Sequence, residues 1–338
     1  MRVYILPAGC TSSEELRVVE RPDPAPGPGQ VAVRVRAASL NARDQAVAAG
    51  TYVGGALARD TTPLSDGAGE VVAVGPGVAR FKPGDRVAAT FFQIPPAGPP
   101  FASRAPLGSP LDGMLAEQVV LYEDGLVAVP PHLSFEEAAC LPCAGVTAWN
   151  ALMRVGTPVR PGDVVLVLGT GGVSMLALQL ARAAGARVIA TSSSDEKIER
   201  ARALVASDGV NYVRQPNWDE KVLELTGGRG VDCVIEAAGA GTLNRSIRAL
   251  APRGKISLMG VLTGRAGDVS PYGLMPKGGS LHGIFVGDRE MFEEMNRAIA
   301  LNAIRPAIDR VFPFEDAAGA FRYHKAGRFV GKIVIRVG

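Results

Sequence analysis

The sequence predicts an α/β protein of two domains, a small β-barrel and a doubly wound parallel sheet covered by helices on both faces. Three observations lead to this prediction. The 338 residues exceed the usual size of one hydrophobic core. The first 125 residues are rich in Val, Gly and Pro, whereas short apolar segments alternate with helical ones after about residue 134. Such alternation is typical of parallel sheets buried on both faces.

Short strands joined by turns account for the first part of the chain. The segments QVAVRVRAASL, GEVVAVG, DRVAAT and LAEQVVL are rich in β-branched residues and end in turn signals. In FKPGDRV, Pro fixes one φ angle of the turn and Gly permits an unusual one. Residues 94–110 contain too many prolines for a helix or an inner strand, so we predict a surface loop or a mobile flap there.

The second part of the chain alternates strands and helices. The predicted strands are VVLVL, RVIAT, GVNYV, DCVIEA, KISLMG and LHGIFV, and the segments between them, such as SMLALQLARAAG, have helical spacing. After a helix near 288–300, the strand-like GKIVIRV is expected to return to the first domain. The predicted domains are therefore 1–126 with 301–338, and 127–300.

Composition and charge exclude several classes of protein. The longest apolar runs are interrupted well before membrane-spanning length, and the first residues lack the pattern of a secretory signal. A net charge of +3 is too small to indicate a nucleic-acid partner. The four cysteines form no dense framework, so we expect a cytoplasmic protein. Cys140 and Cys143 form CLPC, which a redox pair would also show, but their apolar helical surroundings favour buried thiols.

The strongest chemical signal is VVLVLGTGGVSMLALQLARAAGARVIATSSS. A buried strand ends at Leu168, and a helix is predicted from 173 to 184. The turn between them contains Gly169, Gly171 and Gly172, which let the backbone bend and approach a pyrophosphate at the start of the helix. Strand, turn, helix and second strand follow in the expected order, so the segment predicts a dinucleotide site.

The end of the second strand of this segment predicts which dinucleotide binds. An Asp or Glu there accepts hydrogen bonds from both ribose hydroxyls of NAD. Ser192 occupies that place, Ser193 follows it, and Lys197 lies within one helical turn. Hydroxyl donors and an ammonium favour a 2′-phosphate, so the sequence predicts NADP(H). The alternative is that Ser194 or Asp195 only caps the next helix, with Lys197 on a solvated face.

Seven motifs are spread over nearly the whole chain. They are SLNARD at 39–44, PLSDGAGEVVAVG at 63–75, FKPGDRV at 81–87, LPCAGVTAWNAL at 141–152, GTGGVS at 169–174, EAAG at 236–239 and GKIVI at 331–335. Together they resemble those of the medium-chain dehydrogenase/reductase superfamily, and the sequence is most similar to its zinc-free branch of quinone oxidoreductase-like and alcohol dehydrogenase-like proteins. The resemblance implies a GroES-like barrel, a Rossmann domain, an active site in the cleft between them, and a homodimer in which LHGIFV pairs across a two-fold axis.

The resemblance also places the catalytic zinc ligands of related enzymes. Asn41, Ser65 and Cys143 stand at these three positions, so two of the three ligands are missing. One thiol without a nearby His does not make a tetrahedral zinc site. The four cysteines of a structural zinc lobe are absent as well. We therefore expect no metal.

Cofactor-binding residues follow partly from the glycine-rich turn and partly from the resemblance. Two of them have simpler interpretations, Tyr212 as a strand-end aromatic and Thr147 as an ordinary helix position. Phe329 and Lys332 lie on the returning strand that borders the cleft in the family. The predicted residues are Thr147, Gly169, Gly171, Gly172, Val173, Ser192, Ser193, Lys197, Tyr212, Ala237, Ala238, Gly239, Gly260, Val261, Phe285, Val286, Gly287, Phe329 and Lys332.

Hydride transfer without a metal limits the acceptor. Hydrogen-bond donors must stabilise the developing oxyanion, which favours quinones and α,β-unsaturated carbonyls because their product anions are delocalised. Asn41 can donate through its amide, and Tyr52 can serve as a donor or a proton source. The simpler interpretations are a turn residue for Asn41 and loop packing for Tyr52. Asp44 is the third candidate catalytic residue, and it could equally cap a helix that starts at Gln45.

Three functions are consistent with these residues. The first is an NADPH-dependent reductase of quinones or α,β-unsaturated carbonyls. The second is a metal-free enzyme that interconverts alcohols and aldehydes. The third is an NADPH-binding sensor with little catalysis, because the predicted cleft offers no convincing His or Lys acid/base. The expected partners are a small carbonyl or quinone substrate and a second copy of the chain, with no nucleic acid and no membrane.

Overall fold

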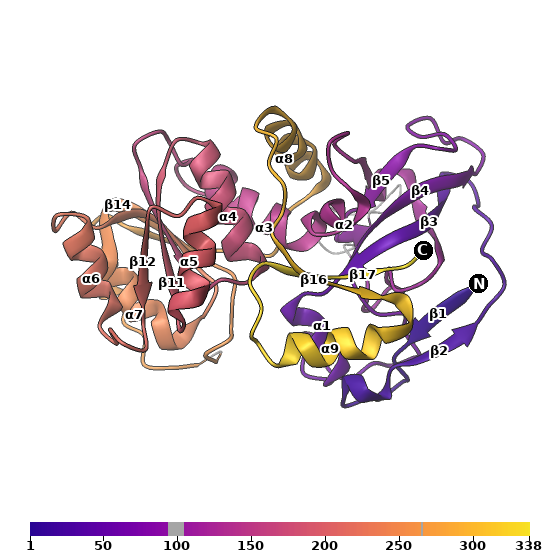
Figure 1. The fold of residues 1–338 in the computed structure, drawn as a ribbon, viewed down its shortest axis with the longest axis horizontal. Helices are drawn as coiled ribbons and strands as arrows, with labels where there is room; N and C mark the ends of the chain where they lie inside the picture. The colour runs from indigo at the N-terminus through magenta and orange to yellow at the C-terminus, as the bar shows by residue number, and fades with distance from the viewer. Residues whose placement is uncertain (94–104, 265) are drawn as a thin grey trace. The chain divides into compact units, whose positions relative to one another are not determined.

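The computed structural model describes residues 1–93, 105–264 and 266–338 (Figure 1). The loop predicted at 94–110 lies mostly outside the described residues. Its last part is described and starts with a two-residue strand at Ala105. None of the helices in the described part of the chain has both the length and the hydrophobicity needed to cross a lipid bilayer.

The described chain forms two compact units. Unit 1 contains Met1–Ala144 and Asp288–Gly338, and unit 2 contains Gly145–Gly287. Both chain ends therefore belong to unit 1, in agreement with the predicted return of the last segment to the first domain. The expected boundaries at 126 and 301 differ from those of the two units, which change after residues 144 and 287.

Unit 1 is built mainly from strands. They are β1 (Arg2–Ile5), β2 (Arg17–Glu20), β3 (Gln30–Ser39), β4 (Asp66–Val74), β5 (Arg86–Ala89), β6 (Phe92–Gln93), β7 (Ala105–Pro106), β8 (Gln118–Tyr122), β9 (Leu126–Ala128), β16 (Ile308–Pro313) and β17 (Lys332–Arg336). Seven of them form one sheet in the order β16-β17-β3-β4-β5-β9, with β8 also paired to β3. The register between β3 and β4 shifts at two places, between Ala32 and Val33 and between Val35 and Ala37, so the pairing of these strands is not regular throughout.

Two helices explain why unit 1 extends beyond its expected boundaries. The short helix α2 (Phe135–Ala138) contacts β3, β4 and β17, and α8 (Arg289–Leu301) contacts β9. Both helices therefore pack on the strand-rich unit. Sequence periodicity identified helical segments here but did not show which core they cover.

The core of unit 1 lies between the long sheet and helix α9 (Ala317–Lys325). Val31, Val33 and Val35 recur every second residue along β3, so their side chains share one buried face. Phe321 of α9 is fully buried in the same cluster. Helix α1 (Ala42–Ala48), which also belongs to unit 1, follows β3 directly.

Unit 2 contains a six-stranded parallel sheet. Its strands are β10 (Val164–Leu168), β11 (Arg187–Ser192), β12 (Asp208–Asn211), β13 (Val231–Glu236), β14 (Leu250–Leu258) and β15 (Ser280–Gly283), and its helices are α3 (Val146–Trp149), α4 (Gly172–Ala183), α5 (Asp195–Leu204), α6 (Trp218–Leu225) and α7 (Ala240–Ala249). The strand order is β12-β11-β10-β13-β14-β15, and every neighbouring pair is parallel. The structure confirms the predicted doubly wound sheet.

The strand order of unit 2 reverses between β10 and β13. These strands are neighbours, yet the chain continues from β10 to β11 toward one lateral edge of the sheet and from β13 to β14 toward the other. The loops that begin at Gly169 and Ala237 therefore start next to each other at the carboxyl edge. Ligands of open parallel sheets bind at such a reversal point.

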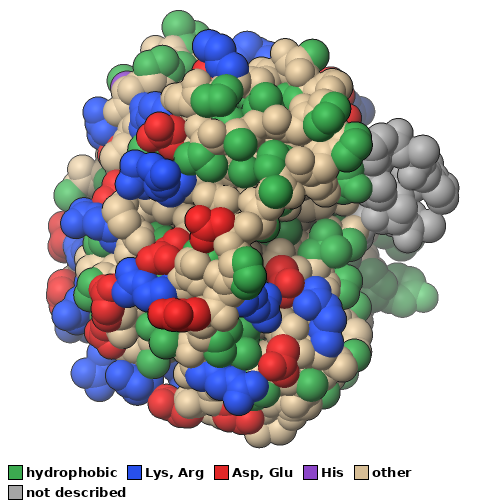
Figure 2. Space-filling model, turned by 90° about the vertical axis from the view of Figure 1, so that its right-hand side faces the viewer, with side chains coloured by type: hydrophobic (Ala, Val, Ile, Leu, Met, Phe, Trp, Pro, Cys, Tyr) green, Lys and Arg blue, Asp and Glu red, His purple; other side chains and the backbone are tan. Residues whose placement is uncertain are grey.

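Charged side chains of both signs are intermixed on the face of the molecule that Figure 2 shows. Ion pairs within unit 1 include Arg2 with Glu117 at 2.7 Å and Arg305 with Glu137 at 2.7 Å. This intermixing agrees with the small net charge of +3.

A close backbone contact joins two loops of the carboxyl edge of unit 2. A Cβ atom at Gly260 would lie 1.6 Å from the carbonyl oxygen of Ala237, a distance that no side chain permits. Gly239 has a φ angle of +102°, which side-chain-bearing residues rarely adopt. The two loops can therefore approach one another only because both positions are glycine.

We predict that Gly260→Ala destabilises unit 2 by about 1–3 kcal/mol, the usual cost of overpacking a fixed site. The cause is displacement of the Ala237 backbone, which has no flexible side chain to yield. Gly283→Ala is the matched control, because a Cβ there meets no atom within 4 Å. Urea unfolding followed by circular dichroism measures both variants, and equal midpoints for the two would contradict the prediction.

Candidate functional site

The glycine-rich turn of unit 2 provides an open surface at the start of α4. Gly169 has a φ angle of +77°, and a Cβ added at Gly169 or Gly171 would meet no atom within 4 Å. The φ angle explains the glycine at 169, and the open space beside Gly169 and Gly171 leaves room for a ligand. Gly172 and Val173 form the first turn of α4, one residue from the predicted helix start.

The start of α4 can accept an anion. Within the described chain, no side chain caps its N-terminus, so the first N–H groups of a twelve-residue helix have no side-chain acceptor. Thr191 Oγ1 accepts from the N–H of Gly169 at 3.2 Å, and Ser174 Oγ donates to the carbonyl of Leu168 at 2.8 Å. These bonds hold the turn against the sheet. The open glycine surface and the helix dipole together fit a pyrophosphate.

The predicted adenosine end lies where β11 meets α5. Ser192 is buried, and its Oγ accepts from the N–H of Ser194 at 3.3 Å, which leaves its O–H hydrogen to donate. Ser193 is exposed. Ser194 caps α5 by accepting from the N–H of Lys197 at 3.4 Å, as one part of the alternative expected, whereas Lys197 itself is half-buried. Tyr212 follows β12 and is 41% exposed.

Arg214 is a cationic side chain of this region that the sequence analysis did not single out. Its guanidinium lies 2.8 Å from Asp195, which also accepts from Asn211 at 2.6 Å. Asn211 pairs with Ser192 in the β11–β12 register. Arg214 therefore belongs to the surroundings of the predicted phosphate-binding residues, but only the strand register reveals this.

Glu236 is a second residue that the sequence analysis missed. It is fully buried at the end of β13. Its Oε1 accepts from the N–H groups of Ala238 and Gly239, each at 3.0 Å, and from Thr242 Oγ1 at 2.7 Å. Its Oε2 accepts from Ser246 Oγ at 2.5 Å. Four donors therefore hold this carboxylate, and through it the loop 237–239. The available signal was an acidic residue at the end of an otherwise apolar strand.

The other predicted cofactor residues of unit 2 vary in exposure. Val261 and Phe285 are exposed, whereas Thr147 is buried in α3. Val286 is buried and has a φ angle of +56°, and its carbonyl accepts from Asn150 Nδ2 at 2.7 Å. The structure therefore provides exposed apolar surface at Val261 and Phe285.

In unit 1, Asn41 and Asp44 form the start of helix α1. Asn41 is the N-cap, and its own N–H donates to Asp44 Oδ2 at 2.7 Å. The helix begins at Ala42 rather than Gln45, so the interpretation of Asp44 as the cap residue was wrong; Asp44 is the third helical residue. Burial raises the pKa of Asp44 to about 6, and the adjacent Arg43 partly opposes this.

Arg43 is buried and organises the surroundings of Tyr52. Its guanidinium carbon lies 4.8 Å from the ring centre of Tyr52 and 5.0 Å from that of Phe91, so it is held between two aromatic rings. It also donates to the carbonyl of Leu107 at 2.9 Å. Burial raises the pKa of Tyr52, which therefore remains a neutral O–H donor at neutral pH.

Four side chains of unit 1 form a closed polar ring. Lys332 Nζ donates to Asn41 Oδ1 at 2.6 Å, and Asn41 Nδ2 donates to Ser65 Oγ at 3.5 Å. Ser65 Oγ donates to Asp66 Oδ1 at 2.7 Å, and Asp66 Oδ2 lies 3.6 Å from Lys332 Nζ. The N–H of Cys143 also donates to Asp66, at 3.1 Å. The ring therefore connects all three positions at which related enzymes carry zinc ligands.

Phe329 and Lys332, at the start of the returning segment, contact different side chains. The ring of Phe329 lies 4.9 Å from that of His324, whose pKa burial lowers to about 4. Lys332 was expected among the cofactor residues, but its ammonium lies against Asn41 in unit 1.

The donors at these positions do not fit zinc. The amide oxygen of Asn41 and the hydroxyl of Ser65 already take part in the polar ring, and burial raises the pKa of the Cys143 thiol, whereas zinc needs a thiolate. The ammonium of Lys332 would also repel a divalent cation. Within the described ranges, no group of three His, Cys, Asp or Glu residues could hold a metal ion. These residues therefore offer zinc no suitable set of ligands.

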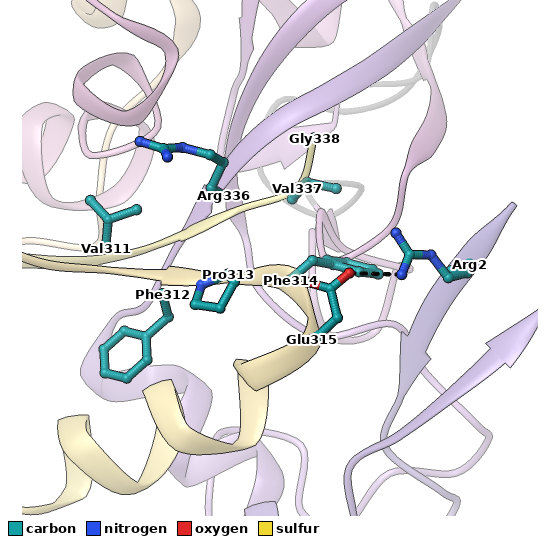
Figure 3. A pocket seen from close by; sticks show the side chains of 9 residues that line it. All are labelled: Arg2, Val311, Phe312, Pro313, Phe314, Glu315, Arg336, Val337 and Gly338. Atoms are coloured by element: carbon teal, nitrogen blue, oxygen red, sulfur yellow. Dashed lines mark hydrogen bonds and ion pairs between the residues drawn. The ribbon is translucent and has the colours of Figure 1, made fainter.

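Unit 1 also contains a cavity of about 370 Å³ that is separate from these residues (Figure 3). Arg2 and Glu315 form an ion pair across it at 2.8 Å. The cavity contains none of the predicted site residues. It is lined by Arg2, Val311, Phe312, Pro313, Phe314, Glu315, Arg336, Val337 and Gly338.

Two family patterns match the chain. The pattern described as alcohol dehydrogenase GroES-like domain matches residues 27–131, in unit 1. The pattern described as zinc-binding dehydrogenase matches residues 172–301, mostly in unit 2. The first match confirms the predicted GroES-like domain.

Curated relatives are similar over most of the chain. A zinc-type alcohol dehydrogenase-like protein of Schizosaccharomyces pombe is 43% identical over 317 residues, which cover 92% of this chain and 91% of the relative. A quinone oxidoreductase of Pseudomonas aeruginosa is 34% identical over 321 residues, covering 92% of each chain.

Solved structures share the fold. One described as an NAD-dependent alcohol dehydrogenase has a TM-score of 0.92 and 36% identity, with 100% of both chains covered. A crotonyl-CoA carboxylase/reductase in complex with NADP has a TM-score of 0.88 and 27% identity, covering 100% of this chain and 94% of the other. With the strand order, the glycine-rich turn and the two matched domains, these similarities show that the chain belongs to the medium-chain dehydrogenase/reductase superfamily.

Proposed function

We propose that this oxidoreductase uses NADPH to reduce a quinone or an α,β-unsaturated carbonyl without a catalytic metal. The observation that carries the proposal is the polar ring of unit 1. At the zinc-ligand positions of related enzymes, it presents an amide and a hydroxyl joined by hydrogen bonds. The Ser65 hydroxyl donates to Asp66, so the Asn41 amide is the donor of this pair, and one amide donor stabilises a delocalised oxyanion more readily than a localised alkoxide.

The adenosine end of unit 2 supports NADP(H) over NAD(H). β11 ends in hydroxyls instead of a carboxylate, and Lys197 lies in the first turn of α5. The crotonyl-CoA carboxylase/reductase structure is described with NADP, which agrees with this choice. The structure described as an NAD-dependent alcohol dehydrogenase favours the opposite choice. The side chains of this chain favour the phosphate, because a carboxylate at this position would repel it and an ammonium attracts it.

The residues of unit 1 have distinct parts in the proposed reaction. NADPH, when bound, supplies a hydride to the acceptor carbon. Asn41 Nδ2 donates to the acceptor oxygen, where the negative charge of the enolate or hydroquinone anion gathers. Tyr52 or water then supplies the proton that balances the hydride. Asp44 holds the start of α1 through the N–H of Asn41 and balances the charge of Arg43.

Reduction of aldehydes without a metal is the second candidate function. The relative and the solved structure whose names contain alcohol dehydrogenase favour it. An alkoxide product concentrates charge on one oxygen, which one amide donor stabilises weakly. This difference ranks the second candidate below the first. A protein that binds NADPH without turnover is the third.

The function is tested by following NADPH absorbance with a panel of quinones, α,β-unsaturated ketones and aldehydes. We expect turnover of the first two classes at rates at least about tenfold above those for aldehydes. A tenfold difference in rate corresponds to about 1.4 kcal/mol of transition-state stabilisation. Preferential aldehyde turnover would support the second candidate. Tight NADPH binding with no turnover would support the third.

We predict that Lys197→Ala weakens NADPH binding by about tenfold or more, because one hydrogen bond to a charged group is worth about 1.5–3 kcal/mol. The affinity for NADH should stay within about twofold, since NADH lacks the phosphate. Isothermal calorimetry measures both affinities. Lys221→Ala, which removes a surface lysine paired with Glu224 on α6, is the control. Equal losses for NADPH and NADH would remove Lys197 from phosphate recognition.

We also propose that the chain forms a homodimer through β15. Among the described strands, β15 pairs only with β14, so its other edge presents free backbone groups. Leu281 on this strand is 39% exposed, and Tyr272 and Met275, which precede it, are exposed as well. An exposed apolar edge strand favours pairing with another strand, and a second copy offers a self-complementary one.

We predict that Leu281→Lys shifts the chain from dimer to monomer, because an ammonium on a paired apolar edge has no compensating partner. Light scattering after size-exclusion chromatography measures the mass. Leu301→Lys is the control, because Leu301 is 86% exposed at the end of α8 in unit 1. A wild-type monomer, or a dimer that both substitutions leave intact, would argue against the β15 interface.

A further inference from the structure

Lys332 is a buried ammonium that unit 1 holds by three oxygen atoms. It is 3% exposed, and its Nζ donates to the carbonyl of Leu40 at 2.7 Å and to Asn41 Oδ1 at 2.6 Å. Asp66 Oδ2 lies 3.6 Å away. Burial of an ammonium costs several kcal/mol unless acceptors and an opposite charge compensate it. The site supplies both, so Lys332 is built into the fold as a charged group.

The contact with Lys332 sets which way the Asn41 amide faces. A carboxamide has an acceptor end and a donor end of nearly equal shape, and only its partners decide between the two orientations. An ammonium has donors and no acceptor, so the amide atom beside it must be the oxygen. Nδ2 of Asn41 is therefore directed away from Lys332, toward Ser65.

Asp66 sets the direction of the remaining bonds in the ring. A carboxylate only accepts, so the hydroxyl of Ser65 donates its hydrogen to Asp66 Oδ1. The lone pairs of Ser65 Oγ are then available to one N–H of Asn41 Nδ2. In the described part of the chain, the other N–H of this amide has no hydrogen-bond partner. A donor-only group and an acceptor-only group thus leave a single arrangement of hydrogens.

We propose that Lys332 is a positioning residue that presents the free N–H of Asn41 to the oxygen of the acceptor. This inference rests on the proposed function, in which Asn41 donates to that oxygen. Orientation is the main effect, because Asp66 carries an opposite charge 3.6 Å from the ammonium and offsets much of its field. The role differs from contact with the cofactor, which sequence comparison alone suggested for this lysine.

A double-mutant cycle tests whether Lys332 acts through Asn41. We expect Lys332→Met to lower kcat by about 10- to 100-fold, somewhat less than the loss of a whole preorganised donor. In the Asn41→Ala background, the same substitution should change kcat by no more than about twofold, because the amide it orients is gone. Equal losses in the two backgrounds would overturn the proposal.

Two further measurements exclude a merely structural or cofactor-binding role. The Kd of NADPH should stay within about twofold in Lys332→Met, and a large rise would assign the lysine to the cofactor. Lys255→Met is the matched control: Lys255 is a buried lysine of unit 2 that donates to the carbonyls of Leu152 at 3.0 Å and Val155 at 2.8 Å. Loss of this ammonium should lower the melting temperature without a comparable fall in kcat per folded molecule.

The side-chain amide of Asn41 provides a readout that does not depend on turnover. Its two N–H signals, identified by their loss in Asn41→Ala, should be distinct and slow to exchange in the wild-type NMR spectrum. In Lys332→Met the chemical shifts of both signals should move toward those of solvent-exposed Asn amides, and their exchange with solvent should become faster. Unchanged signals would refute the orientation by Lys332, whereas absent turnover with changed signals would refute only the proposed function.

Discussion

The buried pair of Lys332 and Asp66 is the interaction on which the polar ring of unit 1 depends. The ammonium and the carboxylate lie 3.6 Å apart, and each has further hydrogen-bond partners. Removal of either charge would leave the other buried and uncompensated, which is far more costly than the loss of an exposed pair. Because the ammonium only donates hydrogen bonds and the carboxylate only accepts them, the pair also sets the direction of the hydrogen bonds that Asn41 and Ser65 make between them.

A buried carboxylate has a comparable structural part in unit 2. Glu236 ends an apolar strand and accepts four hydrogen bonds, two of them from backbone N–H groups of the loop that follows. This loop approaches the backbone of Gly260 too closely for any side chain. Fixed loops at the reversal point of the sheet keep their N–H groups and carbonyls in place before a ligand arrives, which lowers the entropic cost of binding.

The names of relatives and the residues of this chain point to different chemistry at the zinc positions. Zinc binds thiolates, imidazoles and carboxylates, whereas this chain presents an amide, a hydroxyl and a protonated thiol around an ammonium. Hydrogen-bond donors stabilise developing charge by orientation, so the positions of Asn41 and its neighbours matter more than their number. Substrates whose product anion is delocalised need the least from such a site.

The sequence by itself determined the class of each unit and the place of the dinucleotide turn. Both depend on local patterns: alternation of apolar residues along β3, glycines between β10 and α4, and the order of strands and helices. Tertiary structure decided which polar groups meet. Asn41 and Lys332 are 291 residues apart in the chain, and Asp66 and Cys143 are 77 apart, so no local pattern records either contact. The resemblance to the family suggested a cofactor contact for Lys332 because it lies on the returning strand, whereas only the pairing of β17 with β3 shows that its ammonium reaches the Asn41 amide.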